Sequence, residues 1–569
     1  MKSKSFFLLG GMSLIAAASL IVTQTNCQLD DGNGNKAVTS DGGGKAVEIT
    51  ALPPGKSAPP ISKVAGEDWP SWGRNAHRNL YSPEKGLPAS FDPGKFKKGT
   101  EDIDMATTKN VRWAAKLGSQ AYGNTTVAGG KVFIGTNNES PRDKRHVGDR
   151  GIVYCLDEKT GELLWQLVVP KLAAGKAIDW EYLGICSSPT VDGDRVYIVS
   201  NRCAILCLDV EGLKNGNQGY QDEAKFMASP GKPPVKPGPK DADVIWRYDM
   251  RAELGVLPHN ITSSAVLVMG DLVFCTTSNG QDWSHENLPS PQAPCLIALN
   301  KKDGTLAGEE SSGISKRTLH CNWSSPGGGK VKGRDAVFFG AGDGSLYAFS
   351  ATEFKDEKDG KETYHLMKEL WKHDCIPDEY KKDKDGEEIK YPDAEGRSEI
   401  IATPVYHKGH VYVAVGQDPE HGEGVGILSC INADTGRKVW DYRKIQRTLS
   451  TVAIDESNGL LFAVDYTGYV YCLDAKTGKE HWIYDTKAHM WSSPMIADGK
   501  LYIGDEDGDL TVLPSKADFD PKKDEPIFET NMLVPIYATP VVANGTLYIG
   551  TQTHLYAVQA SKKKSASAK

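Results

Sequence analysis

Hydrophobic and polar positions follow one another in a short repeated order along most of the chain. Two small residues, usually followed by Pro, precede a short apolar run. An Asp-Gly or Asn-Gly pair then separates this run from an alternating run, as at residues 500–504 and 546–550. Alternation with a period of two predicts β-strands, and Asn-Gly or Asp-Gly between two such runs predicts a hairpin. The small-residue motif recurs at residues 123–125, 187–189, 263–265, 324–326, 402–404, 450–452, 492–494 and 538–540.

Two further strands follow each hairpin in the same order. The third is a Tyr-Ala-Leu-Asp type of run, and the fourth carries an aromatic residue in most copies. The turn between them keeps one spacing, as in Asp474, Thr477, Gly478 and Trp482. The Asp accepts backbone hydrogen bonds, the Gly permits a positive φ, and we expect the Trp to pack against the neighbouring sheet. The fourth-strand aromatics are Trp165, Trp246, Trp371, Trp440, Trp482 and Phe528.

Four strands per repeat, at roughly 42–50 residues without insertions, predict a β-propeller. The expected fold class is all-β, an eight-bladed propeller of four-stranded antiparallel blades over residues 109–560, with seven blades as the alternative count. Trp113 has the character of a fourth-strand residue but precedes the first motif, whereas the last repeat ends near Val558 without a fourth strand. We expect the N-terminal strand to complete the last blade and close the ring, which removes the open sheet edges.

The N-terminus has the features of a secretory signal. Lys2 and Lys4 precede an apolar run at residues 6–22, so we assign residues 1–26 to a signal peptide. Cys27 is a candidate lipidation site, although the residues before it depart from the Leu-Ala-Gly type of box. The other segments outside the repeat are a flexible Gly/Pro/Ser-rich linker at residues 27–66, a lead-in at 67–108 and a disordered basic tail at 561–569.

Charge and hydropathy narrow the class of partner. The chain has 66 Lys and Arg against 74 Asp and Glu, a net charge of −8, which disfavours nucleic-acid binding because that needs a basic surface. No stretch after the signal segment is long and apolar enough to span a bilayer. We expect an exported monomer of the periplasm or cell envelope, with membrane contact only through an N-terminal anchor.

The Asp-x-x-Thr-Gly-x-x-x-Trp turn, the Ser-Ser-Pro motif and the Tyr-Ala-Leu-Asp strand resemble those of the PQQ-like (pyrroloquinoline-quinone-like) β-propeller repeat family. The resemblance covers nearly the whole chain after residue 100, and residues 68–75 look like the lead-in of secreted members. The family includes quinoprotein alcohol dehydrogenases and also non-enzymatic members, such as the propeller lipoprotein of the outer-membrane β-barrel assembly machinery. The resemblance implies the fold rather than an activity, since these motifs stabilise blades and carry no chemistry.

In the dehydrogenases of this family, PQQ lies on the ring axis between a Trp and an adjacent Cys-Cys disulfide, with calcium beside it. This chain has no adjacent Cys pair, no match to the calcium-ligand and catalytic-Asp motifs, and no Cys-x-x-Cys-His sequence for c-type haem. We therefore assign no catalytic residue and no cofactor, and keep PQQ and calcium as the alternative. Four Cys fall in one repeat column where other blades carry Ala, so we expect buried thiols: Cys155, Cys207, Cys430 and Cys472.

The longest connections lie between the second and third strands and between successive blades, on one face of the expected disc. Elaborated loops on one face of a rigid ring favour a binding face there. The residues before the inner strands point toward the axis, and their functional groups make this funnel the best candidate pocket. The funnel candidates are His259, Asn260, His320, Asn322, Trp323, Arg397, Glu399, His489 and Trp491, and the loop at residues 278–285 adds Asp282 and Trp283.

Residues 416–424, on the same face, gather three acids and a His between glycines. Asp418, Glu420 and His421 are therefore candidate ligands of a cation or substrate. A polar turn held by Asx hydrogen bonds is the more ordinary interpretation. On the opposite face, the insertions at residues 212–243 and 352–368 are expected to be solvated loops.

These observations favour a binding or scaffold module in the cell envelope, with a protein or glycan partner on the loop-rich face. The blade motifs are complete while the cofactor set is not, so we expect a non-enzymatic function. The alternative is a PQQ- and calcium-dependent quinoprotein oxidoreductase that acts on an alcohol or a sugar.

Overall fold

The computed structural model describes residues 67–172, 174–360, 362–389, 397–416 and 425–560, which belong to one compact unit, Ala51–Lys569. These residues form mainly strands, so the all-β class is confirmed. No described helix has the length and apolar character needed to cross a membrane. The helical segments are α1 (Glu223–Phe226), α2 (Met250–Leu254) and the 3-10 turns η1 (Met105–Thr107), η2 (Gly175–Ala177), η3 (Gly212–Asn215), η4 (Ile314–Lys316) and η5 (Asp378–Tyr380).

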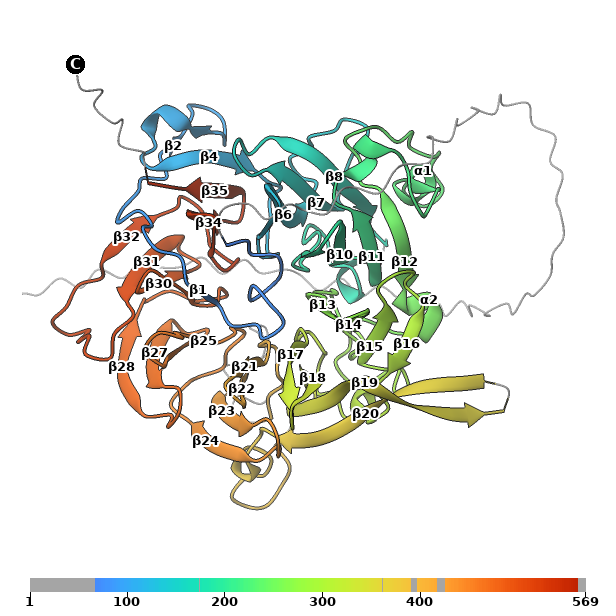
Figure 1. Ribbon diagram of the computed structural model, residues 1–569, viewed down its shortest axis with the longest axis vertical. Helices are drawn as coiled ribbons and strands as arrows, with labels where there is room; N and C mark the ends of the chain where they lie inside the picture. The colour runs from blue at the N-terminus through green and yellow to red at the C-terminus, as the bar shows by residue number, and fades with distance from the viewer. Residues whose placement is uncertain (1–66, 173, 361, 390–396, 417–424, 561–569) are drawn as a thin grey trace, which may run out of the picture. The chain divides into compact units, whose positions relative to one another are not determined.

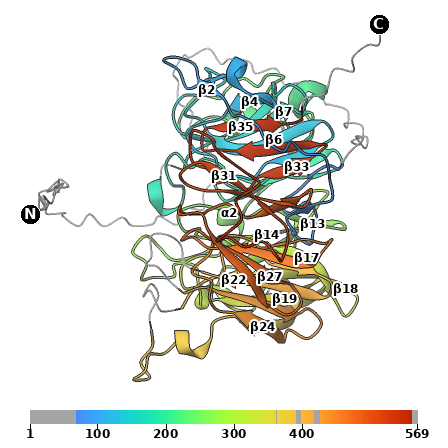
Figure 2. The same ribbon diagram turned by 90° about the vertical axis from the view of Figure 1, so that its left-hand side faces the viewer.

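The strands form four-stranded antiparallel groups that follow one another around a common centre in chain order (Figure 1). Figure 2 shows the same groups from the side. The first four groups are β5–β8 (Thr126–Ala128, Lys131–Asn137, Arg150–Asp157, Leu163–Pro170), β9–β12 (Thr190–Asp192, Arg195–Val199, Ala204–Asp209, Val244–Asp249), β13–β16 (Leu267–Met269, Leu272–Thr276, Leu296–Asn300, Leu306–Glu309) and β17–β20 (Gly327–Val331, Arg334–Gly340, Ser345–Asp359, Glu362–Asp374).

The later groups repeat the same order, with the first strand of each group nearer the centre than the fourth (Figure 1). They are β21–β24 (Val405–His407, His410–Val415, Ile427–Asn432, Lys438–Tyr442), β25–β28 (Ala453–Ile454, Leu460–Val464, Tyr469–Asp474, Glu480–Asp485) and β29–β32 (Met495–Ala497, Lys500–Gly504, Asp509–Pro514, Phe528–Asn531). The last group takes β33–β35 (Val541–Ala543, Thr546–Gly550, His554–Val558) from the C-terminal end and β4 (Val111–Lys116) from the N-terminal side. β4 runs antiparallel to β35, with Trp113 opposite Ala557.

The predicted packing of each fourth-strand Trp against the next sheet is confirmed. The indole of Trp440 donates to the carbonyl of Ala475 at 3.2 Å, and Gly478 lies so close that a Cβ there would be 2.6 Å from Cδ2 of the ring. Glycine is required at this turn by its φ of +71° and by this close approach. The corresponding indole donors and carbonyls are Trp113 and Glu158, Trp165 and Val210, Trp246 and Lys301, Trp371 and Ala433, and Trp482 and Lys516.

A belt of residues encircles the centre, two positions before each inner strand. In six of its members the backbone N–H donates to the side-chain oxygen of the member in the next sheet, as from Thr451 to Ser493 at 2.9 Å. The amide of Thr539 donates to Oδ1 of Asn124 at 2.7 Å and so links the last inner strand with the first. The belt explains why the repeated motif is small and hydroxyl-bearing. Its members are Asn124, Ser188, Ala265, Ser325, Thr403, Thr451, Ser493 and Thr539.

Ala265 shows that one motif was placed out of register. It lies two residues before β13 and donates its backbone N–H to Oγ of Ser325 at 2.8 Å, as Thr403 and Thr451 do to the next belt members. The third copy therefore occupies residues 264–266, and the expected position at 263–265 is wrong by one residue. Two adjacent serines at 263 and 264 made the two registers indistinguishable in the sequence.

The lead-in segment lies against the inner strands of many sheets. Trp69 is fully buried and exchanges both backbone hydrogen bonds with Val127 of β5, at 2.8 and 2.9 Å. Further along, the carbonyl of Leu80 accepts from Ile496 at 2.9 Å, and β1 (Tyr81–Ser82) pairs with β29 in parallel. The lead-in also contains the small sheet of β2 (Lys95–Phe96) and β3 (Ile103–Asp104).

Arg78 anchors this segment at the centre of the molecule. Its side chain is fully buried, and its guanidinium and Nε donate to the carbonyls of Trp72 at 2.8 Å, Pro326 at 2.9 Å and Val266 at 3.1 Å. One cation thus joins the lead-in to two different inner-strand connections. Arginine suits this position because its planar fork donates in several directions at once.

The two expected solvated loops have more structure than predicted. Residues 352–368 continue β19 and β20 as a long exposed hairpin (yellow in Figure 1) in place of a loop, since the strands keep pairing to Asp359 and Glu362. Within residues 212–243, α1 buries Phe226 against the core of the first sheets. The thiol prediction is confirmed for its four cysteines, and all ten described cysteines are free.

Candidate functional site

A cavity of about 510 Å³ lies on the central axis, among the connections that lead into the inner strands. Its walls are mainly aromatic. Trp180 comes from the connection between β8 and β9, Trp323 precedes β17, Trp491 precedes β29, and Tyr122 precedes β5. The remaining lining residues are Leu183, Cys186, Asn260, Ile261, Ser263, Ile401 and Leu449.

One wall of the cavity is a packed cluster of rings. Tyr122 stacks on Tyr537 with centroids 4.8 Å apart, and Trp491 meets both rings edge-on at 5.9 and 5.8 Å. The indole nitrogen of Trp491 donates to the carboxylate of Glu506, which also lies 3.4 Å from Nδ1 of His489. Aromatic rings fixed by several contacts form a preformed surface for a second ring.

The cavity narrows toward the belt, whose eight members line a second space of about 210 Å³. Trp72 of the lead-in also lines this neck, and its indole donates to Oγ1 of Thr403 at 3.0 Å. Among the described residues that line the cavity and the neck, none is Asp, Glu, Lys, Arg or His. Burial raises the pKa of the Tyr122 phenol, and raises the pKa of the Cys186 thiol to about 12, so both stay neutral at physiological pH. The described lining of the axial space therefore carries no charged side chain.

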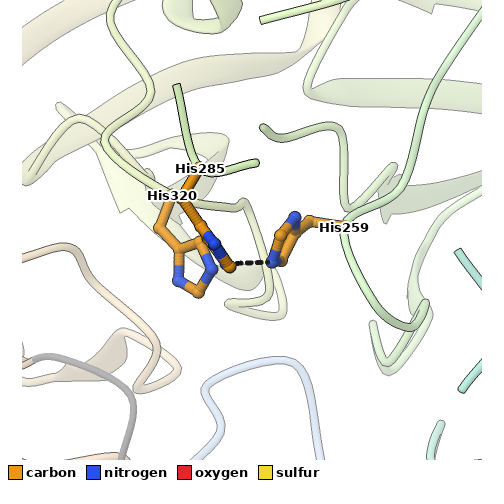
Figure 3. A group of neighbouring side chains, drawn as sticks. All are labelled: His259, His285 and His320. Atoms are coloured by element: carbon orange, nitrogen blue, oxygen red, sulfur yellow. Dashed lines mark hydrogen bonds between the residues drawn. The ribbon is translucent and has the colours of Figure 1, made fainter. Parts of the chain in front are cut away.

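Three histidines meet beside this cavity (Figure 3). His259 lies between α2 and β13, His285 between β14 and β15, and His320 between η4 and β17. Their candidate ligand nitrogens all lie within 4.8 Å of one another, and Nε2 of His259 is 3.1 Å from Nε2 of His285. His259 and His320 are fully buried, whereas His285 is partly exposed. We call these three residues the histidine cluster.

The surroundings of the histidine cluster orient its rings. Nδ1 of His259 lies 2.8 Å from the carbonyl of Gln281, which can only accept, so that nitrogen carries the proton and Nε2 keeps its lone pair. Nδ1 of His320 lies 3.4 Å from Oε1 of the fully buried Glu399. Trp323 packs 5.0 Å from the His320 ring and connects the histidine cluster to the cavity wall.

The structure sorts the other sequence candidates. Asn260, Trp323 and Trp491 line the cavity, and their role as ligand-binding residues stays a prediction. Asn322 is buried, and its side chain donates to the carbonyl of Asn279 at 2.7 Å, so it holds a loop in place.

Three more candidates are not among the lining residues, although the Trp283 ring meets Trp180 of the lining edge-on, with centroids 6.3 Å apart. Arg397 forms an ion pair with Glu388 at 2.6 Å. Asp282 accepts from the amide of Ser284 at 3.0 Å and so stabilises its own turn, while the neighbouring Trp283 is 49% exposed. The candidates Asp418, Glu420, His421 and Cys27 lie outside the described residues, and their roles stay predictions.

Two of the cavity aromatics, Tyr122 and Trp180, were not predicted as site residues from the sequence, and His285 was not predicted to lie with the other two histidines. Tyr122 lies two residues before the first belt residue, and Trp491 and Trp323 hold the same position in their repeats. Alignment of the repeats could therefore have identified Tyr122 as a cavity residue. His285 lies in the middle of a long loop, where neither period nor spacing indicates its neighbours.

Comparison with known proteins agrees with the architecture. The sequence profile of the family described as outer membrane protein assembly factor BamB matches residues 106–374 and 424–518, more than half of the chain. The chain belongs to this family. The resemblance to the PQQ-like repeat family is thereby confirmed.

Curated relatives share a short stretch with the chain. The quinoprotein alcohol dehydrogenase PedE of Pseudomonas putida is 32% identical over 103 residues, which is 17% of this chain and 16% of PedE. A quinoprotein ethanol dehydrogenase of Pseudomonas aeruginosa is 30% identical over 103 residues, also 16% of its length. The match therefore spans less than a fifth of either relative.

Solved structures show the same fold at low identity. A europium-containing methanol dehydrogenase covers 87% of this chain over 91% of its own, with a TM-score of 0.52 and 13% identity. The quinohemoprotein alcohol dehydrogenase ADHIIG of Pseudomonas putida HK5 covers 88% of this chain over 82% of its own, with a TM-score of 0.52 and 13% identity. Similarity at this identity concerns the fold alone.

Proposed function

We propose that the chain is an exported binding module of the cell envelope, built as an eight-bladed propeller that β4 closes. The pairing of β4 with β35 and the hydrogen bond from Thr539 to Asn124 support closure. The signal-like residues 1–26 support export, and the description of the family as an outer membrane assembly factor supports the envelope.

The ligand that we propose is an uncharged glycan bound in the axial cavity. The observation that carries this proposal is the aromatic, charge-free lining of the cavity, with Trp180, Trp323 and Trp491 above a neck of hydroxyl groups. Sugar rings have apolar faces that pack on indoles and hydroxyl edges that exchange hydrogen bonds with Ser, Thr and Asn. A charged ligand would lose its hydration here without gaining an opposite charge.

The quinoprotein alternative fits the described residues less well. PQQ carries three carboxylates, and calcium prefers several oxygen ligands that include Asp or Glu. The described lining offers neither a cation for those carboxylates nor an acid for the metal, and all described cysteines are free. We therefore derive no reaction step through PQQ.

Calorimetric titration of the mature protein tests this proposal. The probes are maltotriose, cellotriose and N,N′,N″-triacetylchitotriose in one arm, and PQQ with calcium chloride in the other. We expect one of the neutral trisaccharides to bind in a 1:1 complex whose affinity changes less than twofold between 50 and 500 mM NaCl, because no described lining group is charged. PQQ with calcium is expected to give no heat of binding and no dye-linked oxidation of alcohols or sugars.

Two variants connect the binding to the cavity. Trp491→Ala is expected to lower the affinity at least tenfold, because it removes one wall of the cavity. Tyr364→Ala, a substitution on the exposed β19–β20 hairpin, is the control and is expected to bind as the wild type does. Binding of none of the sugars, equal binding by Trp491→Ala, or turnover with PQQ would each overturn the proposal.

A further inference from the structure

We propose that the histidine cluster binds one divalent first-row transition-metal ion, with Zn²⁺ and Cu²⁺ as the fitting ions. The ligands are ring nitrogens of His259, His285 and His320, which converge from three separate loops (Figure 3). None of the three histidines is among the described residues that line the axial cavity. Metal binding by the histidine cluster can therefore be tested independently of the proposed glycan binding.

The distances suit an ion of this kind. Histidine nitrogens lie about 2.0–2.1 Å from Zn²⁺, so two of them bound to one ion are about 3.0–3.4 Å apart. Nε2 of His259 and Nε2 of His285 are 3.1 Å apart, and the third ligand nitrogen lies within 4.8 Å of both. The His320 ring therefore has to reorient on metal binding, so that its nitrogen comes within about 3.0–3.4 Å of the other two. Imidazole ligands favour zinc, copper, nickel and iron over calcium or magnesium.

The second ring nitrogens give independent support. Metal-bound histidines commonly donate their other N–H to a backbone carbonyl or a carboxylate, which fixes the ring and raises its basicity. Nδ1 of His259 faces the carbonyl of Gln281, and Nδ1 of His320 faces Glu399. Both buried rings thus carry the outer partner that a metal-binding histidine requires. Glu399 is itself held by the amide of Cys321, which donates to Oε2 at 3.0 Å.

The backbone around the histidine cluster is held in an uncommon conformation. His285 has a φ of +58°, and Asn260, next to His259, also has a φ of +58°. Non-glycine residues with a left-handed φ are uncommon and cluster at binding sites, where surrounding contacts hold them. This backbone conformation of His285, which lies in a long loop, brings its imidazole ring against the ring of His259.

A second group of metal-compatible side chains does not support the same inference. Asp143, His146 and Asp241 also lie within reach of one another. Both carboxylates, however, already accept hydrogen bonds from the guanidinium of Arg145, including two contacts of 2.9 Å to Asp241. A cation placed there would be repelled by the arginine charge, so we assign a metal only to the histidine cluster.

Metal titration of the full mature chain, purified with a cleaved Strep-tag in place of a His-tag and dialysed against EDTA, tests the inference. ZnCl₂ and CuSO₄ are titrated separately by calorimetry, and X-ray absorption of the loaded protein reports the number of imidazole ligands. We expect one ion per chain, three imidazoles around it, and a rise in melting temperature on loading, since binding to the folded state stabilises it.

His285→Ala is the decisive variant because this residue is partly exposed on a loop and its removal leaves the buried core intact. The His285→Ala variant is expected to bind the metal ion at least tenfold more weakly than the wild type, and the Glu399→Gln variant about 10–100-fold more weakly. His489→Ala, whose side chain is 55% exposed and outside the histidine cluster, is the matched control and is expected to bind like the wild type. Unchanged binding by His285→Ala, fewer than about 0.2 ions per wild-type chain, or an absorption spectrum without imidazole ligands would overturn the proposal. Circular dichroism of each metal-free variant verifies its fold.

Discussion

The backbone N–H of Thr539 donates to Oδ1 of Asn124 at 2.7 Å, and this bond joins the connections before the last and the first inner strands. Asn124 also donates its own N–H and its side-chain amide to Oγ of Ser188, each at 3.1 Å. One side chain thus completes the belt in both directions. We expect Asn124→Ala to lower the free energy of unfolding by about 1–3 kcal/mol, because it leaves a buried N–H without its acceptor. Denaturant titration measures this loss.

Two further variants interpret that result. Asn124→Ser supplies the hydroxyl that other belt positions use, and it is expected to recover more than half of the loss. Asn531→Ala removes an exposed asparagine that bonds only within its own loop and β31–β32, and it is expected to cost less than about 0.5 kcal/mol. Equal stability of Asn124→Ala and the wild type would show that the belt does not hold the ring together.

The contact of Gly478 with Trp440 predicts a second loss of stability. Alanine at residue 478 places a Cβ 2.6 Å from Cδ2 of the indole and also has to adopt a φ of +71°. Gly499 has a φ of +69° but nothing within 4 Å of its Cβ position, so Gly499→Ala carries the backbone cost alone. We expect about 1–2 kcal/mol for Gly499→Ala and about 1–3 kcal/mol more for Gly478→Ala.

Thermal unfolding followed by circular dichroism compares the two glycine variants. A lower melting temperature for Gly478→Ala than for Gly499→Ala is the expected order. If the two melting temperatures agree, the indole moves aside at little cost, and the docking of Trp440 on the turn contributes less than its geometry indicates.

Arg78 gives a test of the lead-in. Arg78→Met keeps the apolar stem but removes the donors to Trp72, Pro326 and Val266, so buried carbonyls lose their partners. We expect a loss of about 1–3 kcal/mol for each buried carbonyl that is left without a donor. Trypsin is expected to cleave the variant faster at Lys85 in the lead-in.

Arg112→Met serves as the control for Arg78→Met because Arg112 is exposed and its side chain bonds only to Gln559. It is expected to melt and to resist trypsin as the wild type does. Rapid cleavage of both variants, or of neither, would mean that Arg78 does not anchor the lead-in.

Most of the fold could be predicted from the sequence because the turn and packing requirements of each repeat are visible as residue types at fixed spacings. The turn at Gly478 needs a positive φ, and the Trp440 position needs a partner sheet, so both are visible as a recurring spacing. The register of the third repeat was wrong by one residue because either of two adjacent serines satisfies the same local pattern. Only the position of Ala265 in the belt, a contact between sheets, decides between them.

For the candidate sites as well, features within one repeat could be predicted from the sequence, whereas contacts between distant segments could not. Positions two residues before the belt could be aligned, so Trp323 and Trp491 were predicted to face the axis; both line the cavity, and their role in binding stays a prediction. The histidine cluster could not be predicted as a cluster, because His285 reaches His259 through a loop whose path is set by tertiary contacts and an uncommon φ. The extended hairpin at residues 352–368 was also missed, since its charged residues resemble those of a solvated loop while its strands pair with each other.

The buried position of His146 leads us to expect a loss of stability in mild acid. Burial, opposed by Asp143 and assisted by Arg145 and Arg150, lowers the pKa of His146 to about 4. Well above pH 6.5, His146 is neutral in both the folded and the unfolded chain. Between pH 6.5 and 4, His146 of the unfolded chain binds a proton that His146 of the folded chain does not bind. The free energy of unfolding therefore falls as the pH falls, by up to about 1.4 kcal/mol per pH unit. His146→Leu is expected to remove this slope, so that its free energy of unfolding improves relative to the wild type by about 2 kcal/mol between pH 6.5 and 4.5. Denaturant titration across this range measures the difference, and carboxyl groups with raised pKa values, such as Glu310, cancel because both proteins carry them. A His146→Leu difference that is constant with pH would contradict the assignment.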